Sequence, residues 1–425
     1  MTQQPKELDF LEKFTQTFEM FSYGNTTYGR LCAHVLLGQV LKNVKIYFGP
    51  IYVDPRVSIF VIQPSGTGKS TPWNLIRQVG EKSQMKIEDI DDATDSALVG
   101  HVESQEIIDP ETKTKVVSHN IVKGKLAIGD ILHYDEGWFL VKPGQFSQNA
   151  LTWFQKALNP IGQNRCVRPM ANGTVDFYPT CSLIITSHEL EEAIDIVFKR
   201  GFFQRIVLLP RYIPISDRKQ WEFLRADRLG DRFMSINLDI DNLAEKLMAI
   251  RAKYIDDFIF KIDPNVKPVL KSKIDEFYKL INSVHERVRE IMATFVPRFD
   301  NLMYIFSFHH SCVKFKDVVD LEDVNYGYNL AYGMFKEVLT WVEENIPLLK
   351  LTSKEQSYIT SAYMVYQAME KNSEGFVFRY AFAKACSEKW RISMPTVNRY
   401  LEKFKGFGKL QEVEKDKIRW VKILA

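Results

Sequence analysis

One segment restricts the fold of this chain more than any other: an apolar run that leads directly into a glycine-rich loop and then into a helical pattern. Ser58-Ile-Phe-Val-Ile-Gln precedes Pro64-Ser-Gly-Thr-Gly-Lys-Ser-Thr71, and apolar residues at helical spacing follow from Pro72 to Val79. A strand, a loop and a helix in that order form the phosphate-binding arrangement of α/β proteins. The segment therefore predicts a nucleotide site on a sheet that is covered by helices.

The residues of this loop suit a nucleoside triphosphate bound with Mg²⁺. Its glycines let backbone N–H groups turn toward the β-phosphate, Lys69 reaches the β- and γ-phosphates, and the Ser70 hydroxyl would hold the metal. Gln63 stands where the usual pattern has its first glycine, but that position ends the strand and need not approach phosphate. A turn with an incidental lysine is the alternative. The expected phosphate contacts are Pro64, Ser65, Gly66, Thr67, Gly68, Lys69, Ser70 and Thr71.

Composition places the chain among ordinary globular proteins. Its 425 residues predict two to four domains, and 45% of them are apolar and 26% charged. The five cysteines show no metal-ligand spacing, no signal peptide begins the chain, and no apolar run approaches the ~20 residues of a membrane span. We expect a soluble cytoplasmic protein without a membrane partner.

Four regions differ in their sequence pattern. Residues 1–50 form a helical pattern that we expect to pack on the core. In residues 51–215, β-rich runs at 57–62, 126–134, 175–178, 182–186 and 205–209 alternate with helical stretches, which is typical of an α/β sheet. Residues 216–350 predict a separate set of amphipathic helices, and residues 351–425 a last domain.

Two strand ends carry polar groups suited to catalysis. The apolar run from Leu126 to Tyr134 leads into Asp135 and Glu136, which would orient the magnesium shell and polarise the attacking water. A solvated turn is the alternative for such a pair, but the preceding phosphate loop favours catalysis. Another buried run ends in Thr186 and Ser187. We expect Thr186, with Ser187 as second choice, to lie between the γ-phosphate and the acid pair; a polar strand cap is the alternative.

Basic residues precede the last strand. In Lys199-Arg-Gly-Phe-Phe-Gln-Arg205, a guanidinium is placed where it could meet the γ-phosphate of a neighbouring subunit. Arg205 is the first candidate for this arginine finger and Arg200 the second. Ordinary surface ion pairing is the alternative.

The segment between the acid pair and the polar strand end predicts a hairpin. Asn172-Gly173 is flanked by β-forming residues, a strong two-residue turn pattern. With Met170 near its tip, such a hairpin could bring Arg165, Arg168 and Asn172 to a DNA strand in a central channel. A structural hairpin that only extends the sheet is the alternative.

Five motifs occur in the order found in AAA+ replicative helicases. They are the phosphate loop, the acid pair, the hairpin, the polar strand end and the Gly-Phe-Phe-Gln-Arg segment. Residues 50–215 resemble the minichromosome maintenance (MCM) group and the ATPase modules of phage and plasmid primase-helicases. The resemblance implies Walker B roles for Asp135 and Glu136, a sensor 1 role for Thr186 and a trans finger role for Arg205. No amino-terminal DNA-binding domain, zinc element or primase is expected before this region, which leaves loading and polarity open.

A second segment is similar to the lid of those helicases. There, an arginine opens one helix and a Val-x-x-Glu-Asp-Val motif opens the next, which matches Pro297-Arg298 and the stretch from Val318 to Val324. Arg298 would then be sensor 2, and a plain helix-capping role is its alternative. His309 and His310 are expected at the core edge or surface, because no partner ligands lie at metal spacing.

The last fifty residues predict a winged helix. A helix from Phe376, a second helix capped by Ser393 and stopped by Gly406, and a hairpin that turns at 414–417 make up this pattern. Residues 376–425 hold twelve basic and five acidic residues, a net charge of +7, which leaves −4 for the rest of a chain whose total is +3. Protein contact or regulation is the alternative to DNA binding. The candidate DNA contacts are Thr396, Asn398, Arg399, Lys403, Lys415, Lys417 and Arg419.

The sequence therefore predicts a ring-forming, hexameric AAA+ ATPase that uses ATP and Mg²⁺ to translocate on DNA, as a helicase in the replication of a virus, plasmid or mobile element. Single-stranded DNA would occupy the channel, and duplex DNA could contact the winged helix. Two alternatives stay open. One is an ATP-switched initiator or helicase loader of the origin-recognition type, and the other is a nucleotide-binding regulator without nucleic acid.

Overall fold

The computed structural model divides the chain into two compact units. Unit 1 is Met1–Val342 and unit 2 is Glu343–Ala425. The structure describes residues 8–22, 26–48, 51–64, 71–108, 115–141, 145–188, 201–210, 219, 223, 233–255, 258–284, 286–345, 353–406, 410–415 and 418–423.

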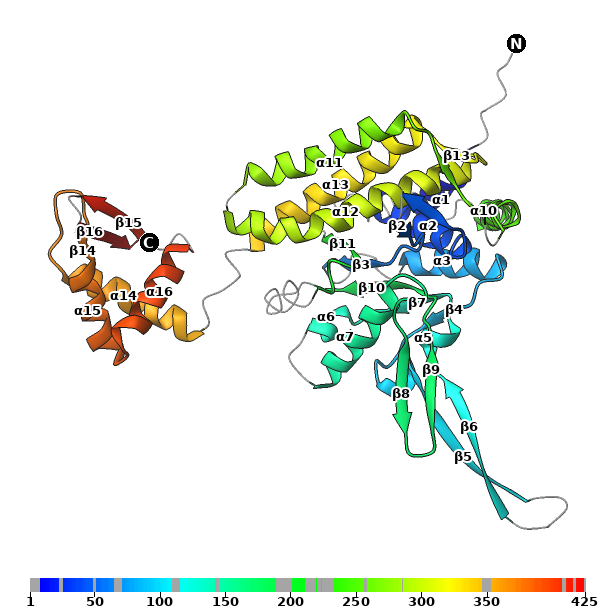
Figure 1. Cartoon of the computed structure of the whole chain (residues 1–425), viewed down its shortest axis with the longest axis horizontal. Helices are drawn as coiled ribbons and strands as arrows, with labels where there is room; N and C mark the ends of the chain where they lie inside the picture. Colours follow the sequence, from blue (N-terminus) through cyan, green and yellow to red (C-terminus); the bar gives the residue numbers. More distant parts are fainter. Residues whose placement is uncertain are drawn as a thin grey trace. The chain divides into compact units, whose positions relative to one another are not determined.

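A five-stranded parallel sheet forms the centre of unit 1. Four of its strands are buried along their whole length, as expected where both faces of a parallel sheet are covered. The strand order is β11 (Val207–Pro210), β3 (Ile59–Ile62), β10 (Ser182–Ser187), β7 (Ile131–Tyr134) and β4 (Ile87–Asp89). Because β10 lies between β3 and β7, the carboxyl ends of these three strands meet at one edge (Figure 1). The α/β class expected from the sequence is confirmed.

Helices cover both faces of this sheet. Trp73 of α3 (Thr71–Lys82) stacks on His133, whereas Phe154 of α7 (Gln145–Leu158) packs on Tyr134. His133 and Tyr134 are neighbours on β7 and point to opposite faces, so α3 and α7 lie on opposite sides. Helix α2 (Thr26–Val40) joins α3 on its face, and α10 (Phe233–Lys253) packs against both.

The amino-terminal region is helical only in part. Phe10, Phe14 and Phe18 are buried along one side of α1 (Phe10–Ser22), which contacts α2 and α3. The helical prediction is wrong near residue 50, where β1 (Ile46–Phe48) pairs with β2 (Ile51–Val53). Both strands consist of β-branched and aromatic residues, which favour pairing over a helix.

The strand predicted from Leu126 to Tyr134 forms only in its second half. Its first part is one helical turn, α5 (Lys125–Ile128), which ends where the Gly129 N–H donates to the Lys125 carbonyl at 3.0 Å. Asp130 then accepts hydrogen bonds from Lys42 (2.7 Å) and Gln39 (3.1 Å), and these contacts hold the start of β7.

Two antiparallel hairpins extend from the sheet and contact each other (Figure 1). The predicted hairpin consists of β8 (Cys166–Met170) and β9 (Gly173–Phe177), and its turn is Ala171-Asn172, one residue earlier than expected. The second hairpin, β5 (Gly100–Ile108) with β6 (Lys115–Lys123), was not predicted. Gly100 at its base has a φ of +119°, and a Cβ there would lie 2.2 Å from the Val122 carbonyl oxygen, so the position requires glycine.

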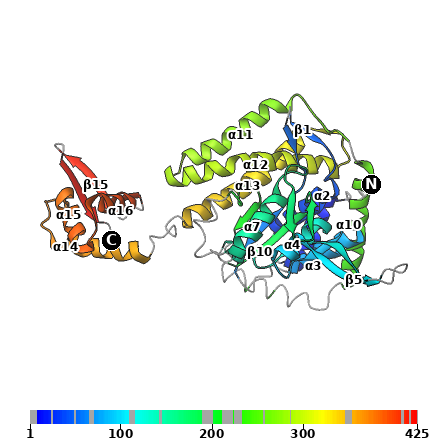
Figure 2. The ribbon, with the colours of Figure 1, turned by 60° about the horizontal axis from the view of Figure 1, so that its bottom comes forward.

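Three long helices complete the described part of unit 1. They are α11 (Val266–Asn282), α12 (Glu286–Val313) and α13 (Leu321–Asn345), which lie together in both views (Figures 1 and 2). They agree with the helical pattern predicted for this region. Short strands β12 (Lys261–Ile262) and β13 (Val318–Val319) pair beside them.

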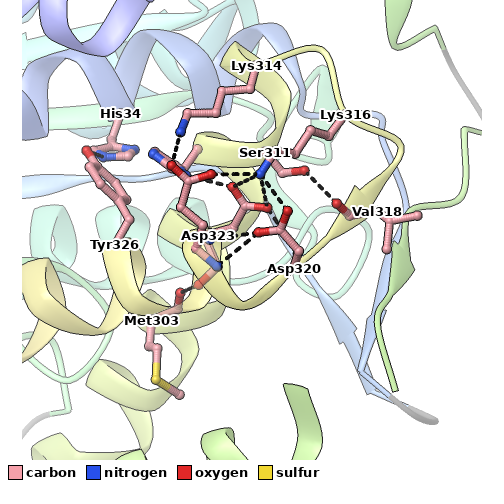
Figure 3. Close-up of polar contacts among 12 residues, drawn as sticks. His34, Met303, Ser311, Lys314, Lys316, Val318, Asp320, Asp323 and Tyr326 are labelled. Atoms are coloured by element: carbon pink, nitrogen blue, oxygen red, sulfur yellow. Dashed lines mark hydrogen bonds and ion pairs between the residues drawn. The ribbon is translucent and has the colours of Figure 1, made fainter. Parts of the chain in front are cut away.

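The turn between α12 and α13 is held by a polar cluster (Figure 3). Asp320 accepts the backbone N–H groups of Glu322 (3.0 Å) and Asp323 (3.2 Å), and so caps the start of α13. Lys316 lies 2.7 Å from Asp320 and 3.2 Å from Asp323, and Asp323 also lies 2.6 Å from His310 Nδ1. The motif from Val318 to Val324 thus opens a helix, as predicted.

Unit 2 has its own apolar core, which includes Val377, Phe382, Val397, Leu401 and Val421. The two predicted helices and the hairpin are present, although the first helix begins at Arg379 rather than Phe376, and α14 and a short strand, β14, were not predicted. Its elements are α14 (Ser353–Ala368), β14 (Val377–Phe378), α15 (Arg379–Trp390), α16 (Met394–Gly406), β15 (Leu410–Lys415) and β16 (Ile418–Ile423), with the sheet order β14-β16-β15.

In the described ranges, no helix is both long enough and apolar enough to cross a lipid bilayer. All five cysteines are buried and free.

Candidate nucleotide-binding site

The structure describes both flanks of the predicted phosphate loop. Ser65, Gly66, Thr67, Gly68, Lys69 and Ser70 lie outside the described residues. Before them, the backbone N–H of Gln63 donates to the Ser187 carbonyl at 3.0 Å, which extends the pairing of β3 with β10 by one residue. After them, α3 begins at Thr71. The loop therefore joins the carboxyl end of a buried strand to the amino end of a helix, the arrangement that binds phosphate.

Asp135 and Glu136 lie at the same edge of the sheet as this loop. They follow β7 directly, and both are exposed. The Glu136 carbonyl accepts the Phe139 N–H at 2.8 Å at the start of α6 (Gly137–Val141). The helix thus begins directly after Glu136, whose carbonyl accepts its first hydrogen bond.

Thr186 is the polar residue that the structure brings to the acid pair. It is fully buried at the end of β10, between β3 and β7, and its hydroxyl donates to Asp135 Oδ1. Ser187 points elsewhere, because its hydroxyl donates to the His188 carbonyl at 2.9 Å. This geometry favours Thr186 over Ser187 as the group between phosphate and acid pair.

The donor set of this edge fits Mg²⁺ and ATP. Magnesium prefers carboxylate and hydroxyl oxygens and is usually held by one or two carboxylates together with substrate phosphates. Asp135 offers an exposed carboxylate beside a helix amino end. Among the described residues, no group of three or more His, Cys, Asp or Glu side chains could hold a metal alone.

Arg205 lies at the amino end of the parallel strands, opposite the end that carries the acid pair. It precedes β11, and its Nε donates to Asn159 Oδ1 at 3.2 Å, while an Nη atom donates to the Gly201 carbonyl. Together with Arg56 and Arg298 it lines a cleft of about 290 Å³. Arg200, the second finger candidate, lies outside the described residues.

The expectation that Arg298 opens a helix is wrong. Helix α12 begins at Glu286, and both Pro297 and Arg298 lie in its interior. Within the described residues, the buried Nε of Arg298 has no hydrogen-bond partner. Burial lowers the pKa of this guanidinium to about 10 against the opposing effect of Asp54, so it stays charged at neutral pH.

A buried ion pair forms one wall of the arginine cleft. The Arg56 guanidinium contacts both carboxylate oxygens of Asp54 at 2.7–3.1 Å, and it also donates to the carbonyls of Cys181 and Asn159, each at 2.8 Å. Because its donors are used in this way, Arg56 has a structural role, whereas Arg298 offers a free donor. Asp54 and Arg56 belong to none of the motifs recognised in the sequence.

The candidate DNA-contacting residues of the β8–β9 hairpin make contacts within unit 1. Arg165 forms an ion pair with Asp176, Arg168 donates to the Gly100 carbonyl, and Asn172 lies 3.4 Å from Ser104. The last two contacts fasten this hairpin to β5. They agree with the alternative of a structural hairpin, although Arg165 keeps 57% of its side chain exposed.

Several candidate DNA contacts in unit 2 also have partners inside the unit. Asn398 accepts a hydrogen bond from Arg379 (2.9 Å), and Lys415 forms an ion pair with Glu374 (2.6 Å). Thr396 bonds Ser393 at 3.0 Å, and Arg419 lies 3.5 Å from Glu414. Arg399 is exposed and Lys403 half-buried on α16, while Lys417 lies outside the described residues.

The histidine expectation is wrong. His309 is fully buried and His310 is 7% exposed, rather than at the core edge or surface. His309 Nδ1 lies 3.0 Å from His34 Nδ1, and His310 contacts Asp323. His133 was not among the predicted site residues, although a histidine inside an apolar strand, two residues before Asp135, is a pattern that could have indicated it.

The chain matches no protein-family model and no curated protein. The roles of its site residues therefore rest on their geometry and on the resemblance of the motifs.

Proposed function

We propose that the chain is an ATP-driven motor of the AAA+ type that acts on DNA, assembled as a ring, in the simplest case a hexamer, with each nucleotide between two subunits. One observation carries this proposal: the acidic groups suited to ATP lie at the carboxyl end of the parallel strands, and the basic groups lie at the amino end. Thr186 and the acid pair follow the carboxyl ends of β10 and β7, whereas Arg205 precedes β11 and lines the cleft with Arg298.

The run from Ser58 to Gln63, which contains β3, spans about 16 Å between the amino and carboxyl ends of the sheet. An arginine at the amino end is therefore too far from phosphates at the carboxyl end to serve its own subunit. A second copy that places its arginine cleft against the carboxyl end would complete the site. The buried Nε of Arg298 supports this arrangement, because an unsatisfied buried donor costs about 1–3 kcal/mol and an incoming anion would satisfy it.

Bound ATP with Mg²⁺ would supply the reacting phosphoanhydride and a strong local positive charge. In that site, Lys69 and Ser70 would hold the phosphates and the metal. Asp135 would orient the magnesium ion and its ligands, and Glu136 would take the proton of the attacking water. Thr186 would orient the acid pair through its hydroxyl. Arg205 and Arg298 would stabilise charge from the neighbouring subunit.

Unit 2 is the candidate DNA-binding domain, as a winged helix. Its support is the net charge of +7 in residues 376–425 and the order helix, helix, hairpin. The intramolecular contacts of Arg168 and Asn172 favour a second candidate function, an ATP-switched initiator or loader that binds duplex DNA through unit 2 without unwinding it.

Forked DNA distinguishes these functions. We expect wild-type protein with Mg-ATP to displace a strand, and Glu136→Gln to keep ATP binding but lose about 10²-fold or more in hydrolysis and unwinding. Lys69→Ala should lose ATP binding, and Glu290→Gln, an exposed carboxylate on α12, should behave as wild type. Hydrolysis with duplex binding but no strand displacement would favour the initiator. Absence of hydrolysis would contradict both functions.

A further inference from the structure

A connected set of polar side chains lies beneath the acid pair, on the face of the sheet that α3 covers. Arg77 of α3 forms an ion pair with Asp89 of β4, and Asp89 Oδ1 lies 3.1 Å from Nδ1 of His133. His133 Nε2 lies 3.4 Å from the Thr186 hydroxyl, which in turn donates to Asp135. The set thus runs from α3, the helix after the phosphate loop, to Asp135, the candidate magnesium-binding carboxylate.

The strand register explains why these groups meet. Asp89 of β4 and Ile184 of β10 both pair with His133 of β7. Side chains two residues further along a strand return to the same face, so Thr186 comes beside Asp135, just beyond His133. The contact is therefore fixed by three adjacent strands rather than by a loop.

The His133 ring is enclosed and held in one orientation. Its residue is 6% exposed, and the ring stacks on Trp73 with a centroid distance of 4.7 Å and an interplanar angle of 25°. Buried polar atoms need protein partners in place of water, and here the partners are Asp89 on one side and Thr186 on the other. In a neutral imidazole one ring nitrogen carries the proton and donates, and the other accepts.

The number of protons decides what each group can do. A carboxylate only accepts, so the ring proton belongs on Nδ1 facing Asp89, which leaves Nε2 as an acceptor. The Thr186 hydroxyl therefore has one proton and two acceptors, Asp135 Oδ1 and His133 Nε2. It can release Asp135 and still donate a hydrogen bond.

We propose that His133, held by Asp89, is a positioning residue that gives the Thr186 hydroxyl a second acceptor, so that Asp135 can be released to take up metal while the buried hydroxyl stays paired. The positioning role rests on the proposed ATP hydrolysis. The hydrogen-bond assignment does not depend on it.

A double-mutant cycle tests the role in catalysis. His133→Phe keeps a ring against Trp73 but removes both nitrogens, and Thr186→Val removes the hydroxyl at nearly constant shape. We expect His133→Phe to lower kcat about tenfold or more, with ATP affinity changed by less than about twofold, and to cause no further loss in the Thr186→Val background. His133→Gln, which keeps an acceptor, should recover part of the activity.

Equal losses in both backgrounds would overturn the role of His133, because a merely structural residue acts independently of the hydroxyl. If wild-type protein hydrolyses no ATP, the proposed function is contradicted and the positioning role falls with it.

A measurement on the nucleotide-free protein tests the hydrogen bonds separately. Nitrogen-15 NMR of histidine-labelled protein reports the tautomer of each ring, and comparison with His133→Gln identifies the His133 signals. We expect a protonated Nδ1 and a bare Nε2 at neutral pH, and we expect Asp89→Asn to reduce this preference. A ring protonated on Nε2 would overturn the proposal whatever the ATPase result.

Discussion

At the scale of single residues, His34 and His309 form an unusual contact inside unit 1. Their Nδ1 atoms lie 3.0 Å apart, both rings are fully buried, and His34 Nε2 also lies 3.1 Å from the Tyr326 hydroxyl. Burial lowers the pKa of both rings, for His309 to about 3. Both therefore stay neutral in the folded protein at pH values where a solvated histidine takes up a proton.

This pair makes the stability of unit 1 depend on pH. Below about pH 6.5 the unfolded chain binds protons on these rings and the folded chain does not. The free energy of unfolding therefore falls as the pH decreases, by up to ~1.4 kcal/mol per pH unit for each ring. We expect hydrogen exchange to show weaker protection of α12 at about pH 5.5 than at about pH 7. Unit 2 contains no histidine and serves as an internal control, and an equal change in α15 would contradict the expectation.

Residues at strand ends could be predicted from the sequence, because a parallel sheet gathers its carboxyl ends at one edge. Thr186 and Asp135 meet for this reason. Arg298 was misplaced because a proline before an arginine usually marks a helix start, whereas Pro297 is tolerated here inside α12. The buried state of His309 depends on α2, which is remote in sequence, so no local pattern announces it.

At the scale of elements, α12 and α13 cross in close contact at Gly327. A Cβ at this position would lie 2.3 Å from Ser307 Oγ and 2.4 Å from the Met303 carbonyl oxygen. The carbonyl belongs to the helix backbone and cannot move aside without shifting α12. Glycine therefore sets how closely the two helices approach.

Two glycines of α13 provide a matched comparison. We expect Gly327→Ala to lower the free energy of unfolding by about 1–3 kcal/mol through overpacking. Gly333→Ala, where a Cβ would meet nothing within 4 Å, should instead raise it by up to ~1 kcal/mol through better helix propensity. Urea unfolding of both variants measures the difference, and a shift of the same sign in both would show that the crossing is not tight.

Elements with a strong local pattern were predictable and those defined by remote partners were not. The strand before the phosphate loop, α3 and the β15–β16 hairpin agree with expectation. The β5–β6 hairpin was missed, although Ile107-Ile108 and Val116-Val117 flank a polar turn sequence that could have indicated it. The strand order itself has no local pattern, because it depends on how the crossovers pack.

At the scale of the whole molecule, two units with different charge share one chain. Unit 2, residues 343–425, carries a net charge of +5 and unit 1 carries −2, and unit 2 has a separate core. This division supports a nucleotide-dependent unit joined to a nucleic-acid-binding unit. The winged-helix assignment, DNA binding and ring assembly stay predictions.

The central claim, a nucleotide site completed by a second subunit, is tested most directly by mixing two inactive variants. Arg205→Ala leaves Glu136 intact, and Glu136→Gln leaves Arg205 intact, so a mixed ring contains interfaces with both groups. We expect equal amounts of the two variants to recover about one quarter of the wild-type ATPase rate, because about one interface in four is then complete. ATPase activity no higher than that of the separate variants, in mixed rings that bind ATP, would contradict the shared site.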